Sequence, residues 1–427
     1  LLIPAGIAGL ALWLFFTPFT QDAPQLDVSK EQAGEIAIKT LKERFNVDHE
    51  EWTVLTGITD NAGLQHKFIW QEAGKENYEK YLGGFLSPPR WSVRLVKTKG
   101  KVEDRAEEYL ANVDVEGNVL GFSHVIPEKR EGAVLEQTDA QSLVDSVLIE
   151  VLGIERENLK EISVTPKMLE NRRDWTFVYA DTLNYTLDKG QGRYRISIAG
   201  DKLISLSSYV HVPEEWERAY EDRQSKRSVI KIIGSVFSII LLIAGMIWGI
   251  VRWTRKEFSV KLFLYFVIGL LGLFILDSLL TWDSVMFGYQ TSLPWSNFVT
   301  MFIVLLGIAG LFSSAGLGII GGMSVNLVPA KVSDKYNWLK AIGLGLALFG
   351  LNALLSKFEI KTSPFWADFE ASNSMLPIVS TGIGDIQSFI GITGILLILY
   401  FGLHTFTKKW SESKWLFGGL TVLAGIL

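Results

Sequence analysis

Among the ionisable side chains of the apolar segments, three are candidates for chemistry within the membrane: Asp277, Asp385 and His404. Neither aspartate has a second carboxylate or a histidine at helical spacing, i+3 or i+4, with which to share a proton or a metal ion. A lone carboxylate in an apolar setting stays neutral or caps a helix rather than acting as a base. We therefore expect no catalytic, cofactor-binding or metal-binding residue here, and no cleavage of a peptide bond by the chain as given.

Asp385 stands in a polar, glycine-bearing stretch, 380–388, inside an apolar segment of 375–407. That segment is too long for one straight membrane helix of about 20 residues. The stretch predicts either a helix that begins near Asp385, with the carboxylate as N-cap at the membrane interface, or a helix that is broken there. Irregular backbone at membrane depth is tolerated only where it is buried in protein or lines a wet cavity. His404 follows near Lys408 and is expected at the interface.

The polar part of the chain shows no residue pattern typical of catalysis. The histidines there are scattered without metal-ligand spacing: His49, His66, His124 and His211. The adjacent acidic pairs Glu107-Glu108 and Glu214-Glu215 are expected to be exposed, solvated charge. No Gly-rich phosphate loop and no nucleophile elbow occurs.

Composition excludes several function classes. The chain contains no cysteine, which rules out a disulfide framework, an iron–sulfur cluster and thiolate zinc. Its net charge of −5 gives no basic footprint for nucleic acid. The apolar content of 48% is high for a soluble protein. The membrane bilayer is therefore the first partner to consider.

Hydropathy divides the chain into an apolar anchor (1–18), a polar region (20–228) and a largely apolar region (230–427). No small-residue cleavage site follows the first segment, so we expect a retained anchor rather than a signal peptide. Later membrane spans are predicted at 230–251, 260–281, 297–322, 338–356, 375–407 and 415 onward. Because the last apolar run continues to Leu427, we expect the helix bundle to be truncated at its C-terminus.

Charge in the connecting loops predicts orientation. Basic residues follow alternate spans: Arg252, Arg255, Lys256, Lys331, Lys335, Lys340, Lys408, Lys409 and Lys414. The intervening loop 281–297 has no Lys or Arg, and the loop 356–373 is mainly acidic. Cationic loops stay in the cytoplasm. We therefore expect a multi-pass protein of the cell membrane whose polar region is extracytoplasmic.

The polar region contains two similar halves, which we predict to be α+β modules at 27–130 and 136–225. Ser29 and Thr138 each open a helical pattern as N-cap of a capping box, with Gln at N3. Phe68-Ile69-Trp70 and Phe177-Val178-Tyr179 are expected at equivalent buried strand positions. Turns are expected at Gly117-Asn118 and Gly200-Asp201. Each half ends with a similar short motif that contains Val, Pro and Glu, at 125–128 and 210–214. The expected fold is an α+β domain of one helix on a short antiparallel sheet, twice, followed by an all-α membrane bundle.

Small residues at helical spacing predict close packing inside that bundle. Gly318 and Gly322 are at i and i+4, as are Gly343 and Ala347. Such pairs lie on one helix face and allow neighbouring helices to approach closely.

The α+β modules resemble the small PepSY-like modules found on the outer face of bacterial membrane proteins. The segment from Trp175-Thr176-Phe177-Val178-Tyr179 through Gly192-Arg193-Tyr194-Arg195 to Val212-Pro213-Glu214 and Tyr220-Glu221 carries a further resemblance. Together with Pro127-Glu128 and Gly132-Ala133, it is similar to long bacterial members of the CPBP group of CAAX-protease and bacteriocin-processing intramembrane proteases. The resemblance implies an anchor, an outer domain and a protease bundle.

The present sequence departs from the catalytic pattern that the resemblance to this family implies. The family uses a Glu-Glu-x-x-x-Arg helix, a Phe-x-x-x-His helix and a further histidine helix, through which a metal ion or a direct base activates water within the membrane. Glu-Glu-x-x-x-Arg occurs nowhere in this chain, and the expected position holds Phe389–Leu397, without an ionisable group. Tyr400-x-x-x-His404 is a partial match to the second helix.

Three interpretations of function remain. In the first, the chain belongs to the protease lineage but lacks its catalytic glutamates, and binds a membrane or envelope protein or peptide without cleaving it. In the second, it is an active intramembrane metallo- or glutamic endopeptidase whose catalytic helices lie beyond residue 427. In the third, it is a transporter or envelope-complex subunit in which Asp277 and Asp385 line a polar path.

The predicted orientation can be tested by labelling. Cysteines introduced at Ser225 and Ser333 should react oppositely with a membrane-impermeant thiol reagent in intact cells, Ser225→Cys strongly and Ser333→Cys only after permeabilisation. Since the chain contains no native cysteine, labelling reports the introduced thiol alone. Equal labelling of both sites in intact cells would contradict the orientation.

Overall fold

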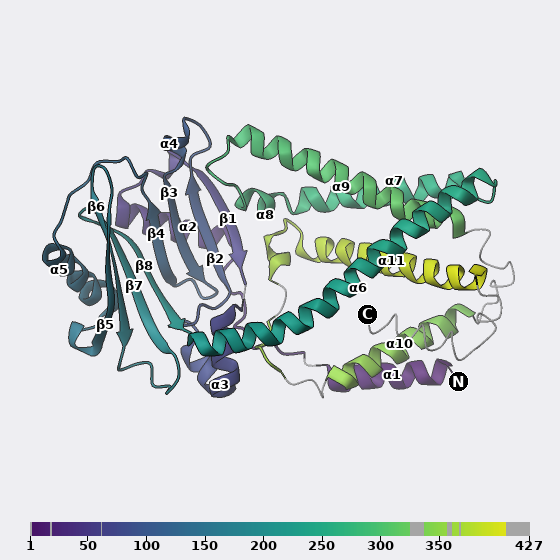
Figure 1. Ribbon diagram of the computed structural model, residues 1–427, viewed down its shortest axis with the longest axis horizontal. Coiled ribbons are helices and arrows are strands. Elements are labelled where there is room, and N and C mark those ends of the chain that lie inside the picture. Colours follow the sequence, from purple (N-terminus) through teal and green to yellow (C-terminus); the bar gives the residue numbers. More distant parts are fainter. Residues whose placement is uncertain are drawn as a thin grey trace.

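The computed structural model describes residues 2–17, 19–60, 62–324, 337–356, 361–366 and 369–406. It consists of an eight-stranded antiparallel sheet with its covering helices, here called the sheet domain, and a set of long apolar helices that extends from one edge of the sheet (Figure 1). The predicted basic loop around Lys331 and Lys335 and the segment from 407 onward lie outside the described residues.

The strands form one continuous sheet in the order β1-β2-β3-β4-β8-β7-β6-β5. Their bounds are β1 Thr53–Thr59, β2 Arg90–Val96, β3 Glu108–Asp114, β4 Val119–Val125, β5 Leu159–Met168, β6 Arg173–Asp181, β7 Gln191–Ala199 and β8 Lys202–His211. Each set of four strands follows a helix, α2 (Lys30–Phe45) or α5 (Gln137–Val147). The sequence suggested two separate short sheets; instead the fourth strands pair, β4 with β8, and join both halves into one sheet.

The core of the sheet domain lies between the sheet and its helices. Along β2, Trp91, Val93 and Leu95 are buried, as strand alternation requires of the covered face. In the other half Phe177 and Tyr179 of β6 are buried, and the Tyr179 hydroxyl exchanges hydrogen bonds with Gln141 of α5 at 2.8 and 3.2 Å. Each helix therefore covers its own half of the sheet.

Local signals at the helix start and at the turns are confirmed in part. The Ser29 side chain caps α2, and Gln32 bonds back to the Ser29 N–H, forming the predicted capping box. Gly117 and Gly200 occupy the β3–β4 and β7–β8 turns with φ of 96° and 61°, a left-handed conformation that glycine adopts at low cost. The prediction for Thr138 is wrong, because α5 begins at Gln137 after Glu136 and its N-cap makes no side-chain bond.

The predicted equivalence of Phe68 and Phe177 is also wrong. Phe177 lies on a strand, but Phe68 lies in α3 (Leu64–Tyr81), a helix inserted between β1 and β2. Both rings are fully buried, Phe68 against Trp216 at a centroid distance of 5.2 Å. Three apolar residues in a row do not distinguish a buried strand from a buried helix, and here the helix-forming residues that follow decide the outcome.

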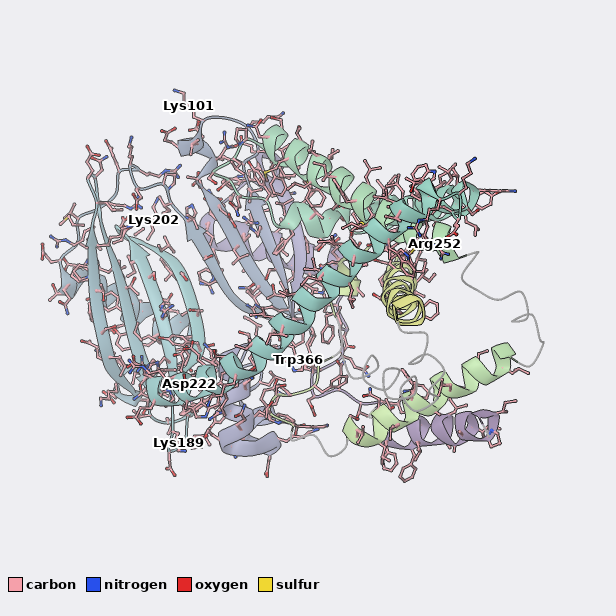
Figure 2. All side chains as sticks on the ribbon, turned by 45° about the vertical axis from the view of Figure 1, so that its right-hand side comes forward. Lys101, Lys189, Lys202, Asp222, Arg252 and Trp366 are labelled. Atoms are coloured by element: carbon pink, nitrogen blue, oxygen red, sulfur yellow. The ribbon has the colours of Figure 1, made fainter. Side chains whose placement is uncertain are left out.

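A single helix connects the sheet domain to the helical region. Helix α6 (Glu214–Thr254) is 41 residues long, and its polar first half precedes the apolar window Ile232–Thr254. Figure 2 shows its course, from Asp222 beside the sheet domain to Arg252 near the remote end. The predicted span at 230–251 is therefore the second half of a longer helix.

Among the residues that the structure describes, three helices are long and apolar enough to cross a membrane: Ile232–Thr254 within α6, Val260–Leu280 (α7) and Trp295–Met323 within α9 (Trp295–Ser324). Shorter apolar helices cover Ile3–Phe16 within α1 (Leu2–Phe16) and Ile342–Ser356 within α10 (Asn337–Ser356). A short helix, α8 (Trp282–Phe287), links α7 to α9. These features fit a membrane protein.

Helix α11 (Pro377–Phe406) runs without interruption through Asp385, so neither a start nor a break occurs at that residue. Proline at the first helical position has the φ a helix needs and lacks only an N–H that would be unpaired. Ser374 accepts a hydrogen bond from the Leu376 N–H at 3.3 Å just before this start. The polar residues of 380–388 are therefore accommodated inside a regular helix.

Glycines produce two different kinds of helix contact. On α10, Gly343, Ala347 and Gly350 face Gly6 and Gly9 of α1 so closely that a Cβ at any of these α1 glycines would overlap the α10 backbone. On α9 the small residues face aromatic rings instead. Gly318 lies against Val267 and Phe263, Gly321 against Phe266 and Gly322 against Phe258. The sequence predicted close packing but did not indicate which helices would meet.

We expect Gly9→Leu to destabilise the α1–α10 pair by about 1–3 kcal/mol, the usual cost of overpacking, because its Cβ would overlap Ala347 Cα. Ala8→Leu is the control, since Ala8 is exposed on the opposite face of the same helix. Thermal unfolding of the purified protein in detergent measures both. Equal melting temperatures for the two variants would contradict this packing.

Candidate functional site

The loop between α7 and α9 packs against strands β1 and β2, at the β1 edge of the sheet. Leu55 of β1 and Val96 of β2 are buried against Met286, Tyr289 and Phe298. At Gly57 a Cβ would lie 2.6 Å from the Phe287 ring, so only glycine allows α8 to approach β1 this closely. This loop, predicted from its lack of basic residues to lie on the same side of the membrane as the polar region, contacts the sheet directly.

Polar contacts join the same surfaces. The Lys30 ammonium of α2 lies 2.6 Å from the Asp283 carboxylate of α8. Arg94 of β2 forms two bonds to Glu108, at 2.6 and 2.9 Å, and also donates to the Phe287 carbonyl. Surface ion pairs contribute little individually, so the apolar contacts supply most of the attachment and the charged contacts orient it.

A second loop, between α10 and α11, closes on the other side of β1. The Asn373 side chain in the 3-10 turn η5 (Glu370–Asn373) accepts a buried hydrogen bond of 2.7 Å from the Ile58 N–H. The Phe369 N–H donates to Asp60 at 3.2 Å. Trp366, near the junction in Figure 2, donates its indole N–H to the Tyr78 hydroxyl of α3 at 3.0 Å. The sheet domain is thus held by two loops of the helical region.

A cleft of about 860 Å³, here called the junction cleft, remains between these attachments. It is bordered by the start of α2, the edge strand β1, α8 and the start of α11. Its apolar lining comes mainly from Leu26, Val28, Ile38, Val54, Trp91 and Met375. Both the sheet domain and the helical region therefore contribute to one site.

The edge of β1 presents free backbone groups to this cleft. In an antiparallel ladder, alternate residues point their N–H and C=O groups to the same side. Because the Ile58 N–H points away from β2 toward Asn373, the groups of Val54 and Thr56 point the same way. In the described part of the chain, no hydrogen-bonding partner occupies these positions. Asn373 satisfies one position of the edge, and an added strand could satisfy the next two.

The charge of the junction cleft is acidic. Four carboxylates line it, Asp27, Glu31, Glu35 and Asp283, against the Lys30 ammonium, which is already paired with Asp283. This arrangement favours an extended segment that is apolar and neutral or basic, and disfavours an acidic one.

The three predicted intramembrane candidates do not come together. Asp277, in the last turn of α7, accepts a 2.8 Å hydrogen bond from the Ser380 hydroxyl of α11. Asp385 is exposed on α11. For His404 the structure describes the backbone only, in the last turn of α11, about 28 Å further along the helix at 1.5 Å per residue. Asp277 therefore links two helices at the end of the bundle nearest the sheet.

A buried charge cluster surrounds Glu107 and was not predicted from the sequence. The expectation of solvated charge is wrong for this residue, whose side chain is 5% exposed. Its carboxylate lies 2.5 and 2.9 Å from Arg130, 3.0 Å from His124 and 3.1 Å from Lys97. The His124 ring stacks on Tyr109 at 3.9 Å. These partners come from separate strands and loops, so no local spacing signals the cluster.

Burial by itself would raise the pKa of Glu107, but hydrogen bonds from His124, Arg130 and Lys97 outweigh it and hold the pKa far below its usual range. The group is therefore ionised in the folded protein, and the Arg130 and Lys97 cations match its charge. The cluster closes the end of the β3–β4 hairpin over the segment that leads to α5. Its geometry indicates a structural role.

This cluster predicts a specific pH dependence of stability. A carboxyl whose folded pKa is depressed contributes fully above its unfolded pKa of about 4.5 and loses that contribution as pH falls toward the folded value. Glu107→Gln should lower stability at pH 7 by about 1.5–3 kcal/mol, since it removes the charged hydrogen bonds that Arg130 and Lys97 donate to this buried position. It should also flatten the decline of stability below about pH 4.5. Denaturant unfolding between neutral and acidic pH measures both effects.

Glu103→Gln, at an exposed position of the same domain, is the matched control and should leave the profile unchanged. A Glu107→Gln profile parallel to that of the unmodified protein would contradict the assignment of the acid-sensitive step to this cluster.

Comparison with known proteins gives one distant similarity. The sporulation-killing factor biosynthesis protein SkfC of Bacillus subtilis strain 168 is 22% identical over 369 residues, covering 82% of this chain and 68% of that protein. No family model matches the chain, and no solved structure matches it. Since the similarity covers most of the chain, it includes parts of both the sheet domain and the apolar helices. The chain is thus similar, at low identity, to a bacterial biosynthesis protein.

Proposed function

We propose that this protein is a multi-pass membrane protein of the CPBP lineage that binds an extended segment of a membrane or envelope peptide in the junction cleft without cleaving it. The observation that carries this proposal is the free edge of β1. Its Val54 and Thr56 backbone groups face a cleft built jointly by the sheet domain and the helical region. A peptide segment bound there would lie between the sheet domain and the helical region, where a peptide that extends out of the membrane bundle would reach the sheet.

The proposed organisation has four parts: an anchor (1–18), two PepSY-like modules (27–130 and 136–225) and a membrane bundle (230–427). The repeated order of one helix followed by four antiparallel strands supports the two modules. The contacts of loops 281–297 and 361–374 with the sheet support their location on the same side of the membrane as the polar region. Loop charge supports the extracytoplasmic side for both.

A binding role rather than catalysis is supported by the polar groups of the bundle. Asp277 is engaged by Ser380, and Asp385 lies at an exposed position of α11. Peptide hydrolysis within a membrane needs a positioned group that activates water, and neither aspartate has a second carboxylate at helical spacing. The similarity to a killing-factor biosynthesis protein is consistent with a peptide, made or matured at the membrane, as the bound partner.

Edge pairing can be tested with a variant that removes a single N–H. Thr56→Pro deletes the outward N–H of β1, and proline is tolerated on an edge strand where the N–H points away from the sheet. The purified full chain in nanodiscs should bind a fluorescein-labelled octapeptide of alternating Val and Lys. Thr56→Pro should weaken this binding about three- to tenfold, the value of one hydrogen bond. Fluorescence anisotropy measures the affinity.

Thr56→Val is the matched control, because it changes the same side chain but keeps the N–H, and it should bind like the unmodified protein. Thermal unfolding of both variants identifies any loss of folding. Equal affinity of a folded Thr56→Pro variant and the unmodified protein would overturn binding at the β1 edge.

A further inference from the structure

A second cleft lies at the centre of the sheet, where its two halves meet. Strands β4 and β8 pair only at Phe122–Leu206 and Ser123–Ser205, whereas each of the other neighbouring pairs extends over at least six residue pairs. Beyond these two pairs the halves diverge, as Figure 1 shows. The loop at Gly84, which accepts a 2.6 Å hydrogen bond from Ser208, borders the opening.

The opening is a cleft of about 540 Å³, here called the central cleft. It differs from the junction cleft in its chemistry, because its described lining includes two guanidinium groups and no carboxylate. Hydrogen-bond donors complete the lining, among them Asn112, Ser123, Ser207 and Tyr209. In a chain with more acidic than basic residues, a cleft with this lining is selective for negative charge.

Within the part of the chain that the structure describes, neither arginine forms an ion pair with a carboxylate. Arg195 donates to the Tyr209 hydroxyl at 3.4 Å and stacks over that ring at 4.8 Å. For Arg90 no hydrogen-bond or ion-pair partner is found among the described residues, and burial lowers its pKa. Asp114, opposite Arg90 on β3, is engaged in its own turn by the Asn118 and Glu116 N–H groups at 2.7 and 2.9 Å.

A partly buried cation without a partner is costly unless a ligand supplies the opposite charge. Guanidinium groups bind carboxylates with two parallel hydrogen bonds. The diverging strands add backbone groups at 119–121 and 207–209 that lie beyond the paired positions. A planar anion carried on an extended backbone matches both features.

We infer that the central cleft binds an acidic peptide segment, with Arg90 and Arg195 receiving its carboxylates and the diverging edges of β4 and β8 receiving its backbone. This site is separate from the junction cleft and does not depend on the function proposed for it. The linings of the two clefts differ in the sign of their charge, so the clefts select different peptide segments. The junction cleft selects a basic or neutral segment, and the central cleft selects an acidic one.

The experiment uses the purified full chain in phosphatidylcholine nanodiscs and a fluorescein-labelled hexapeptide of alternating Glu and Ser. Arg195→Gln should weaken binding at least tenfold, the usual effect of losing a charged hydrogen-bonding pair. Arg193→Gln is the matched control. It removes the same charge two residues away on the same strand, where the side chain bonds to Gln191 rather than lining the cleft, and it should change the affinity less than twofold.

Arg90→Gln should also weaken binding, and thermal unfolding confirms that each variant is folded. Two competitors separate the sources of negative charge. Inorganic phosphate and phosphatidylglycerol vesicles should displace the peptide only weakly. Arg195-dependent binding of either competitor that matches or exceeds that of the peptide would overturn the peptide assignment. Unchanged peptide affinity in a folded Arg195→Gln variant would overturn the site itself.

Discussion

The hydrogen bond between the Ile58 N–H and the Asn373 side chain, 2.7 Å and buried, joins two parts of the chain that could otherwise move independently. An edge strand with unpaired N–H groups is a liability in water, and its burial without a partner would cost free energy. The helical region resolves this by supplying Asn373 on one side of β1 and the apolar cluster around Tyr289 on the other. Because both loops belong to the bundle, the sheet is fixed relative to the helices, and the cleft between them has a defined shape.

The helical region satisfies its own polar groups in a similar way. Asp277 and Ser380 lie on different helices, and their hydrogen bond joins α7 to α11 near the end of the bundle that contacts the sheet. Glycines then set the distances between helices. Where α1 meets α10 they allow backbone contact, and where α9 meets α7 they make room for phenylalanine rings. Close packing of small residues, rather than burial from water, is the main source of helix association in a lipid environment.

The two clefts show how one sheet can present opposite charge at different places. Among the described lining residues, the junction cleft has four carboxylates and one paired lysine, while the central cleft has two arginines and no carboxylate. Each is formed where strand pairing stops, at the edge of β1 or between β4 and β8. Free backbone groups and uncompensated charge therefore occur together, a combination suited to extended peptides.

Features that depend only on neighbours along the chain could be predicted from the amino-acid sequence. Composition indicated the apolar helices, Ser29 and Gln32 indicated a capped helix, and Gly117 and Gly200 indicated turns, because each signal acts within a few residues. Other features depend on contacts that form only in the folded protein. Phe68 lies in a helix rather than on a strand, and Asp385 lies inside a continuous helix. Glu107 is buried and contacts cationic side chains from distant segments of the chain. The same holds for the clefts, whose residues are brought together by strand order and loop docking. Burial and charge pairing depend on contacts between residues far apart in the chain, so they cannot be predicted from the spacing of residues along a short segment.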